Sequence, residues 1–533
     1  MSLTLRNTNV GKLSAELYDV CIVGGGINGA VSAAALAAQG ISVALIDRGD
    51  FAGETSSQSS NLAWGGIKYM ETLEFPLVWN LCDSRNHLSR SYPSTVQEIR
   101  FLTTIEKGFR FPPWFVYLGS LAYWVMGRFA TRPPEYLSAK KLAEREARIR
   151  VDDARGGIEY SDCYLHDNDA RFVFNFVRSA MDYGAVAANY VGATGAERVG
   201  DHWTVTAKDS IYDTPVNIRA RVLINACGPY VDGFNELSGI TTKHRHVFSK
   251  GVHLMVDRIT DDPRILAFFA SDGRLFFVIP MGPKTCIGTT DTQVEDPRVG
   301  VTADDRRFVL ENANELLALD RPLTEEDVIA ERCGVRPLAV SGGDTTADWV
   351  ALSRKHAIDA DLERQHLSLF GGKLTDCINM GDEVADLVAE MGVARPYPGH
   401  RWYGEPDESV RQEFLHQARL VGLDDMADPR ACEPLSLRLW RRYGRAAFDM
   451  LEEIREEPVN ATRMMEHAEY LRCEIEQAGR REMITKLDDF LRRRSKISLV
   501  VPRERWIDSP GLREACRVLF GDEADAKLEE YLN

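Results

Sequence analysis

The sequence predicts an α/β protein with three successive parts. A glycine-rich turn after a short apolar strand opens a helix of small residues near the N-terminus, as in a nucleotide-binding parallel sheet. Strand-like segments with a different pattern fill the middle of the chain. The last part is charged, short of glycine and helical in pattern. We therefore expect a Rossmann-like domain, an antiparallel β substrate domain and a C-terminal all-α domain.

The first element is a strand–turn–helix–strand unit. Residues 18–23 form a short apolar strand, residues 30–39 a helix rich in alanine, and residues 41–46 a second apolar strand. Strands buried on both faces are continuous apolar runs of this kind. The arrangement predicts two neighbouring parallel strands joined by a crossover helix.

The turn of this unit carries a dinucleotide-binding pattern. Gly24, Gly26 and Gly29 have G-x-G-x-x-G spacing, and Asp47 ends the second strand. The glycines allow a tight turn, close approach of a pyrophosphate and close helix–strand packing, while the helix N-terminus offers N–H groups to the anion. Asp47 would accept a hydrogen bond from a ribose hydroxyl. The pattern predicts a bound dinucleotide.

Two further segments suit contacts to a cofactor. Residues 55–60 are rich in hydroxyl groups and lead to Gly65 and Gly66, although a solvated serine loop would look the same. Residues 371–375 form a second glycine-rich helix start, which predicts a second anion or carbonyl site by the same dipole argument. Between them, a strand over residues 222–225 leads into a Gly-Pro turn.

The domain boundaries follow from these patterns. Residues 1–16 form an N-terminal tail, and residues 17–397 contain the cofactor and substrate domains, interleaved. A substrate-side antiparallel sheet covers about residues 240–330. Residues 398–533 form the C-terminal helical domain, and the sequence leaves open whether it forms a homodimer, contacts a membrane or braces the first domain.

Composition excludes several classes of protein. The net charge of −16 argues against a general nucleic-acid binder. The 10 cysteines are scattered singly, without a C-x-x-C pair, so we expect no metal site and a reducing, cytoplasmic compartment. Residues 1–16 lack the apolar core of a signal peptide, and no run is apolar enough to span a bilayer.

One segment suggests peripheral contact with a membrane. Residues 111–126 are apolar and aromatic, with Arg110 and Arg128 on either side. The segment is too short to span but could lie in a membrane interface. The alternative is a buried helix at a domain junction.

As an ordered set, these motifs resemble the aerobic, FAD-dependent glycerol-3-phosphate dehydrogenases, within the glycine-oxidase-like flavoproteins. The resemblance covers roughly residues 16–500. The matching stretches are residues 19–47, 55–60 with Gly65 and Gly66, 159–163, 225–229, 250–253, 277–280, 287–291, 334–338, 370–375 and 482–494.

The resemblance implies that sn-glycerol 3-phosphate is oxidised to dihydroxyacetone phosphate. Hydride passes to flavin N5 of a non-covalent FAD, and electrons leave to a quinone at the inner face of the cytoplasmic membrane. The predicted cofactor contacts are Gly24, Gly26, Asn28, Gly29, Asp47, Thr55, Ser56, Ser60, Gly65, Gly66, Gly228, Gly372, Lys373, Leu374 and Thr375.

The resemblance also implies the catalytic and substrate-binding residues. A secondary alcohol must lose its proton as hydride departs, which predicts His253 for proton transfer and Arg336 for alkoxide stabilisation. A phosphate dianion needs fixed cations, which predicts Lys68, Arg336, Arg354 and Lys373 as substrate contacts. His253 could instead be a structural partner on its strand, Arg354 could lie on a solvated face, and Lys373 could lie near the flavin carbonyls.

Three residues depart from the family pattern. The chain has Asn61 where the family usually has lysine, Trp64 in place of histidine, and Lys68 in place of arginine. Lysine keeps the charge but loses the bidentate fork. The departures leave open a longer polyol phosphate such as erythritol phosphate, an oxygen-using oxidase, and a flavin-binding sensor with little catalysis.

Overall fold

We analysed a computed structural model of the chain, which describes residues 2–270, 274–341, 356–428 and 431–533. The chain divides into two compact units, each made of separate segments. The first contains Met1–Ser57, Asp167–Val247 and Pro337–Asn533, and the second contains Gln58–His166 and Phe248–Arg336.

The first unit is built on a mainly parallel sheet. Strand β1 (Leu17–Val23) lies between β2 (Val43–Ile46) and β10 (Thr214–Asn225), and both neighbours are parallel to it. The predicted first strand therefore joins the predicted second strand and the returning strand near Gly228. The remaining strands of this sheet are β7 (Val186–Ala188), β8 (Val191–Val199), β9 (His202–Asp209), β17 (Ala357–Asp361) and β18 (His366–Phe370).

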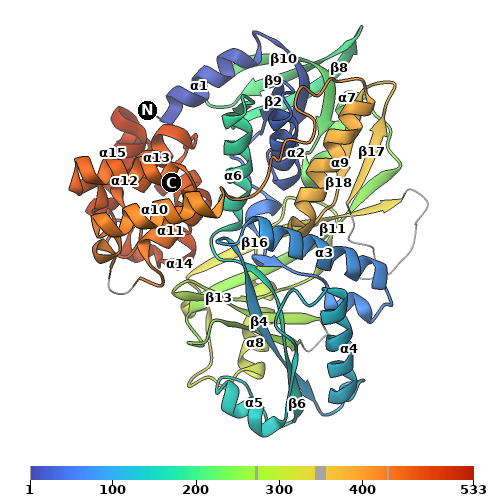
Figure 1. Cartoon of the computed structure of the whole chain (residues 1–533), viewed down its shortest axis with the longest axis vertical. Coiled ribbons are helices and arrows are strands. Elements are labelled where there is room, and N and C mark those ends of the chain that lie inside the picture. Colours follow the sequence, from blue (N-terminus) through green and yellow to red (C-terminus); the bar gives the residue numbers. More distant parts are fainter. Residues whose placement is uncertain (1, 271–273, 342–355, 429–430) are drawn as a thin grey trace. The chain divides into compact units, whose positions relative to one another are not determined.

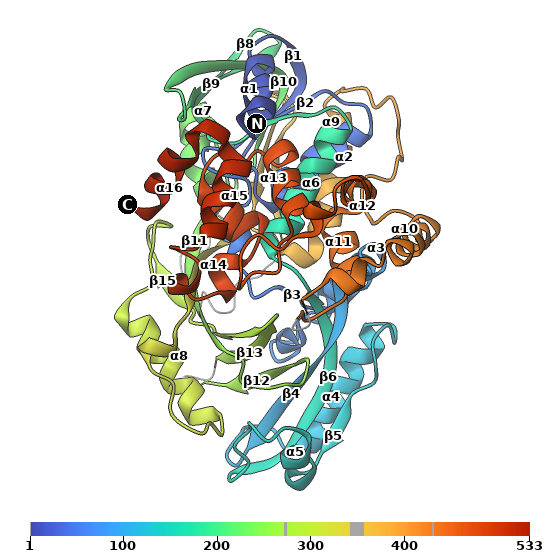
Figure 2. The same ribbon diagram turned by 90° about the vertical axis from the view of Figure 1, so that its left-hand side faces the viewer.

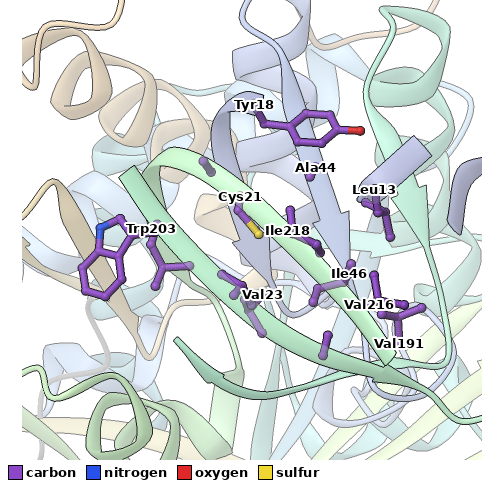
Figure 3. Close-up of a cluster of buried hydrophobic side chains, with 14 of the residues drawn as sticks. Leu13, Tyr18, Cys21, Val23, Ala44, Ile46, Val191, Trp203, Val216 and Ile218 are labelled. Carbon is purple, nitrogen blue, oxygen red and sulfur yellow. The ribbon is translucent and has the colours of Figure 1, made fainter. Parts of the chain in front are cut away.

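Helices and an apolar core cover this sheet. Helix α2 (Ile27–Ala38) packs against α6 (Asp169–Asp182) and α9 (Cys377–Glu390), and the three helices stand side by side in Figure 1. Figure 3 shows a cluster of buried apolar side chains. It contains Val23 of β1 and Ile46 of β2, together with Trp203 of β9 and Ile218 of β10. Leu13 of helix α1 (Ser2–Leu13) joins this cluster, so the predicted N-terminal tail contains a helix.

The second unit contains the sheet that the sequence predicts over about residues 240–330, and this sheet is larger than predicted. Besides the predicted region it includes strands from residues 62–165, and β12 pairs with β4 in parallel. Many other strand pairs of this sheet, such as β11 with β14 and β4 with β6, are antiparallel. The strands are β3 (Leu62–Ala63), β4 (Val96–Glu106), β5 (Glu135–Leu137), β6 (Ala154–Leu165), β11 (His244–Asp257), β12 (Arg264–Phe269), β13 (Leu275–Met281), β14 (Lys284–Gly288), β15 (Thr292–Val294) and β16 (Ala330–Ser341).

Four helices accompany this sheet. Helix α8 (Ala303–Leu316) buries Val309 and Ala313 in a core with strand residues such as Leu254. Figure 2 shows the α8 ribbon beside the strands of this sheet. The other three are α3 (Phe75–Ser91), α4 (Pro113–Met126) and α5 (Ala139–Arg145).

The C-terminal part is helical, as the sequence predicts, and belongs to the first unit. Its helices, orange to red in Figure 1, pack around a core that includes Phe414, Leu439 and Trp440. They are α10 (Glu408–Val421), α11 (Leu435–Tyr443), α12 (Ala446–Glu456), α13 (Arg472–Arg481), α14 (Ile497–Val500), α15 (Pro510–Phe520) and α16 (Ala524–Leu532). The predicted fold class, α/β with a C-terminal helical domain, is confirmed.

Candidate active site

The glycine turn of the first unit has a shape that only glycine allows at two positions. Gly24 has φ +108°, and a Cβ there would overlap the carbonyl of Ala226 at the end of β10. A Cβ at Gly29 would overlap the carbonyl of Gly24. The turn therefore closes tightly on itself and on the neighbouring strand.

The helix start after this turn suits an anion. Gly26 is the N-cap of α2 and offers no side-chain cap to the first turn, while Ile27 N–H donates to Ser56 Oγ at 3.0 Å. A Cβ at Gly26 would approach only Ser56 Oγ, at 3.2 Å. Backbone N–H groups and the helix dipole at such an end favour a phosphate. The donor set fits the pyrophosphate of a dinucleotide.

Asp47 fixes the same turn from the end of β2. Its Oδ2 accepts a hydrogen bond from Gly25 N–H at 2.7 Å, and its Oδ1 accepts from Gly49 N–H at 2.8 Å. Burial raises the pKa of Asp47 to about 6, although the two amides act in the opposite direction. An ionised carboxylate accepts about four hydrogen bonds, so capacity is left for the predicted ribose hydroxyl.

The second glycine-rich segment meets the first. Asn28 Nδ2 donates to Gly371 O at 2.9 Å, and a Cβ at Gly372 would lie 3.2 Å from Asn28 Oδ1. The structure thus brings together two of the predicted cofactor contacts, Asn28 and Gly372. Helix α9 begins later than predicted, at Cys377, because residues 374–376 form a 3-10 turn.

His356 lies beside this second turn and was not predicted. Its Nδ1 is 2.9 Å from Asp376 Oδ2, its Nε2 is 2.8 Å from Glu383 Oε2, and its Cβ is 3.6 Å from a Cβ placed on Gly372. Burial lowers the pKa of His356, but the two carboxylates outweigh it and raise the pKa to about 9. His356 is therefore a cation at neutral pH. Its partners lie far along the chain, so no sequence motif marks it.

The remaining predicted contacts of the first unit lie in turns. Thr55 and Ser56 belong to a 3-10 turn, Thr375 is buried, and Lys373 and Leu374 are half-buried. Gly228 begins a turn after β10 with φ +56°.

In the second unit, the double glycine packs on a buried carboxylate. Gly65 N–H donates to Asp162 Oδ1 at 3.0 Å, and a Cβ at Gly65 would overlap the hydroxyl of Tyr123. Asp162 also accepts from Arg85 Nη1 at 2.9 Å and from Tyr123 O–H at 2.6 Å. This packing explains Gly65, and Gly66 follows with φ +80°. Sequence reasoning missed the buried network, whose members lie on separate elements.

His253 lies on β11 and is 2% exposed. Within the described part of the chain, neither ring nitrogen has a hydrogen-bond partner. Burial, followed by the charges of Arg336 and Arg332, lowers the pKa of His253 to about 3, so the ring is neutral. Buried side-chain nitrogens are seldom left without a partner, and each one calls for an explanation, such as a catalytic role or an ordered water or ion. The imidazole suits a polar group of a bound molecule.

Arg336, on β16, lies across the backbone of Gly251, where a Cβ would overlap its guanidinium. Its Nη2 donates to Thr289 Oγ1 at 3.1 Å, and its Nη1 lies 3.4 Å from Asp291 Oδ1. The side chain stays 28% exposed. A guanidinium held in this way, but not buried, retains access to an anion.

Arg332 lies four residues before Arg336 on β16, a spacing that places both side chains on the same face of the strand. Arg332 was not predicted from the sequence. It is wholly buried and donates from Nη1 to Ser59 O at 2.6 Å and to Asn61 Oδ1 at 2.8 Å. Asn61, one of the departures from the family pattern, is thus an acceptor for an arginine. The signal available in the sequence was the Arg332–Arg336 spacing around a glycine.

The other predicted residues of the second unit lie close to strand β3 in the sequence. Lys68 lies in the 3-10 turn Ile67–Met70 and Ser60 precedes β3, both half-buried. The ring of Trp64 is 5.9 Å from that of Tyr69. Arg354 lies outside the described residues. Among the described residues, no group of His, Cys, Asp or Glu side chains could hold a metal ion.

Comparison with known families identifies both parts of the chain. Residues 19–387 match the model of the FAD dependent oxidoreductase family. Residues 407–506 match that of the C-terminal domain of alpha-glycerophosphate oxidase.

Individual relatives agree with this assignment. Glycerol-3-phosphate dehydrogenase 2 of Mycobacterium tuberculosis is 30% identical over 509 residues, covering 93% of this chain and 84% of the relative. Aerobic glycerol-3-phosphate dehydrogenase of Bacillus subtilis is 30% identical over 396 residues, 72% of this chain and 69% of the relative.

A solved structure extends the likeness to three dimensions. The glycerol-3-phosphate dehydrogenase from Bacillus halodurans, complexed with FAD, aligns with a TM-score of 0.72 at 25% identity and covers 100% of this chain and 97% of that one. With the glycine turn, the carboxylate of Asp47 and the second glycine start already described, these matches show that the chain belongs to the FAD-dependent glycerol-3-phosphate dehydrogenase family.

Proposed function

We propose that this protein oxidises the C2 hydroxyl of sn-glycerol 3-phosphate, yielding dihydroxyacetone phosphate. The single observation that carries the proposal is His253, a buried neutral imidazole under the influence of two arginines. The His253 imidazole could contact a ligand, and it lies on β11 in the sheet that we assign to the substrate side. Family membership supplies the substrate class.

The residues of the first unit fit FAD. We propose that Gly24, Gly26 and Gly29 admit the pyrophosphate, Asp47 binds the ribose, and Gly372 to Thr375 contact the other end of the cofactor. When bound, FAD accepts the hydride at flavin N5. The remaining proposed contacts are Asn28, Thr55, Ser56, Ser60, Gly65, Gly66 and Gly228.

His253 would hold the hydroxyl and take its proton. A neutral imidazole has one ring nitrogen able to accept a proton, and burial keeps competing water away. A base with a pKa near 3 would be weak in the free enzyme. Burial is the largest cause of this low pKa, and the charges of Arg336 and Arg332 come second. Negative charge that develops on the substrate beside these arginines would raise the pKa of His253.

Arg336 would stabilise the negative charge that develops on the alkoxide. Its guanidinium is fixed by Thr289 and Asp291, so little reorganisation is needed during the reaction. We assign the phosphate group to the cations Lys68, Lys373 and Arg354, of which Arg354 rests on the family pattern alone.

An anaerobic titration tests this function. Adding sn-glycerol 3-phosphate to the purified yellow holoenzyme should bleach the flavin absorbance, and glycerol without the phosphate should not at equal concentration. Failure of every phosphorylated alcohol to reduce a correctly loaded enzyme would contradict the proposal and favour a flavin-binding sensor.

The substrate could instead be a longer polyol phosphate. Trp64 and Lys68 replace a histidine and an arginine of the family pattern, and this change favours a pocket of different shape and weaker bidentate recognition. Erythritol 4-phosphate is the probe for this candidate. Faster flavin reduction by it than by glycerol 3-phosphate would make it the better assignment.

We propose a membrane quinone as the electron acceptor and peripheral attachment through α3 and α4. Four apolar side chains of the predicted interfacial segment are exposed, namely Trp114, Phe115, Leu118 and Val125. Phe75 and Trp79 of α3 and Phe129 after α4 are exposed as well, and Arg128 lies 5.7 Å from the Trp79 ring. Apolar side chains bordered by arginine suit the headgroup level of a bilayer. Among the described helices, none is long and apolar enough to cross a membrane.

Sedimentation with anionic lipid vesicles checks the attachment. The triple variant Trp114→Ser/Phe115→Ser/Leu118→Ser should lose vesicle binding, while Leu420→Ser, at an exposed leucine of α10, should keep it. Equal binding by both variants would contradict this surface. Turnover with a soluble quinone, compared with peroxide release in air, distinguishes a dehydrogenase from an oxidase.

A further inference from the structure

The loop that follows β2 shapes the nucleotide-binding turn. It begins at Asp47, and Ala52 N–H donates to Gly25 O at 3.0 Å. The Phe51 ring lies directly against Gly25, where a Cβ would overlap it. Residues 47–53 are called the ribose loop below. Displacing this loop would move both the carboxylate of Asp47 and the support beneath the glycine turn.

The ribose loop is anchored by one buried carboxylate, Asp50, which is 3% exposed. Arg494 donates to both of its oxygens, at 2.8 Å from Nη1 and 2.8 Å from Nη2. Arg493 Nε donates to Oδ2 at 2.7 Å, and Asn189 Nδ2 donates to Oδ1 at 3.0 Å. Two guanidiniums from the far end of the sequence therefore hold the loop.

Ring contacts reinforce this connection. The guanidinium of Arg494 lies 3.9 Å from the centre of the Phe174 ring on α6. Phe174 in turn packs on Phe51, with ring centroids 6.2 Å apart. A continuous series of contacts thus connects the C-terminal part to the glycine turn, through Arg494, Phe174, Phe51 and Gly25.

The segment that supplies the two arginines is itself fixed on both sides. Asp489 accepts from Tyr190 O–H at 2.7 Å and from Arg493 Nη2 at 2.7 Å. Glu482 forms a bidentate pair with Arg171 of α6, at 2.5 Å and 2.9 Å. Because these partners already fix the segment, Arg493 and Arg494 lose little conformational entropy when they bind Asp50. The segment is therefore a rigid support for the ribose loop.

We propose that residues 482–494 are a positioning element for the cofactor, through which the C-terminal helical region holds the ribose loop in the shape that retains FAD. This assigns a role to a motif that the substrate chemistry does not use. The inference depends on FAD binding at the glycine turn and is independent of which alcohol is oxidised.

The test compares two conservative substitutions in the holoenzyme. Arg494→Lys keeps the charge but loses the fork that spans Asp50. Arg438→Lys is the matched control, because Arg438 also forms a buried ion pair in the helical region, at 2.7 Å to Glu474, but does not contact the ribose loop. The rate of FAD release is followed by the gain of free-flavin fluorescence after dilution.

We expect Arg494→Lys to release FAD about tenfold faster or more, the factor that corresponds to losing one charge-assisted hydrogen bond. Arg438→Lys should stay within about twofold of the parent. Amide hydrogen exchange gives a readout without bound cofactor: in the apoprotein, exchange in residues 47–53 should rise in Arg494→Lys and not in Arg438→Lys.

Equal FAD release and equal exchange in the two variants would overturn the proposal, because the arginine would then contribute only general stability. If Arg494→Lys does not fold, Arg493→Lys provides the same comparison through its bond to Asp50. A parent enzyme that holds FAD but is not reduced by glycerol 3-phosphate would refute the proposed substrate and leave this inference intact.

Discussion

The buried ion pairs of the first unit differ from the buried imidazole of His253 in the second unit. In the first unit, Asp50, Arg171 and Arg442 are buried and each is paired with opposite charge, at 2.8 Å to Arg494, 2.5 Å to Glu482 and 2.6 Å to Asp167, respectively. In the second unit, His253 is equally buried, and its ring nitrogens have no partner among the described residues. Pairing within the protein indicates a structural role.

The lack of a partner is not by itself a sign of a ligand site, because His366 in the first unit is also buried and its ring nitrogens have no partner among the described residues. His253 differs from His366 in the charges of Arg336 and Arg332 that act on it.

The contrast concerns sites and not whole units. The second unit also contains a fully paired buried charge, because Asp162 binds Arg85, Tyr123 and Gly65. Asp162 has an oppositely charged partner, Arg85, whereas the charges that act on His253 are those of Arg336 and Arg332. Substitutions of His253, Arg171, His356 and Lys107 test this distinction.

Replacing His253 should separate activity from stability. His253→Phe removes the proposed base, so anaerobic flavin reduction by sn-glycerol 3-phosphate should slow by about 10²- to 10⁴-fold in stopped-flow absorbance. Because neither ring nitrogen bonds to the described protein, the free energy of unfolding should change by less than about 1 kcal/mol. A variant that reduces at the parent rate, or that unfolds readily, would show that His253 is structural.

Replacing Arg171 should have the opposite outcome. Arg171→Met leaves Glu482 buried without its partner, and such a loss costs about 3–5 kcal/mol. Thermal and urea unfolding of the holoenzyme should show this decrease. The rate of flavin reduction should match the parent in the fraction that remains folded and still holds FAD. A small loss of stability would mean that the pair is not the support that its geometry implies.

Changes of pH should affect the stability contributions of His253 and His356 in opposite directions: acid makes His253 destabilising, and alkali removes the stabilisation by His356. The pKa of His253 falls to about 3 in the folded protein, so below the ordinary value of 6.5 the unfolded chain takes up a proton that the folded chain refuses. His253 therefore lowers stability as the pH falls from 6.5 toward 3, by about 1.4 kcal/mol per pH unit.

The pKa of His356 rises to about 9, so its contribution is fully present below pH 6.5 and is lost as the pH rises through 9. His356→Gln should cost up to about 3 kcal/mol at pH 6 and nothing near pH 10, by thermal unfolding across that range. His253→Phe should change stability only on the acid side. An unaltered pH profile in either variant would contradict the corresponding pKa shift.

A surface pair should contribute almost nothing. Lys107 and Asp153 form an ion pair at 3.2 Å, but their side chains are 62% and 77% exposed. Lys107→Ala should change the free energy of unfolding by less than about 1 kcal/mol, and less still in high salt. An effect as large as that of Arg171→Met would mean that burial is not what separates strong from weak pairs here.

Local patterns in the sequence were enough to predict the central parallel strands of the first unit and its glycine turn. Gly24, Gly29 and Asp47 act within one strand–helix–strand unit, so their spacing carries the information. The sequence pattern marks Asn28 and the glycine pair at Gly371 separately. It does not predict the hydrogen bond between them, which depends on tertiary structure.

Long-range contacts could not be predicted in the same way. Asp50 and Arg494 are distant in sequence, and neither lies in a pattern that specifies the other. Gly65 was predicted as a cofactor contact, yet its immediate constraint is Tyr123, which comes from the aromatic segment. The size of the second sheet was also underestimated, because β4 and β6 lie far along the chain from residues 240–330, where the sheet was expected, and join it only through tertiary pairing.

The attachment of Arg494 to Asp50 has a consequence for biosynthesis. Domains generally fold from the N-terminus as they are synthesised. Here the nucleotide-binding turn is made early, but its last support is the arginine pair at 493 and 494, which leaves the ribosome only after the whole second unit. Tight capture of the flavin should therefore be a late, post-translational event, and nascent chains stopped before residue 493 should bind it weakly.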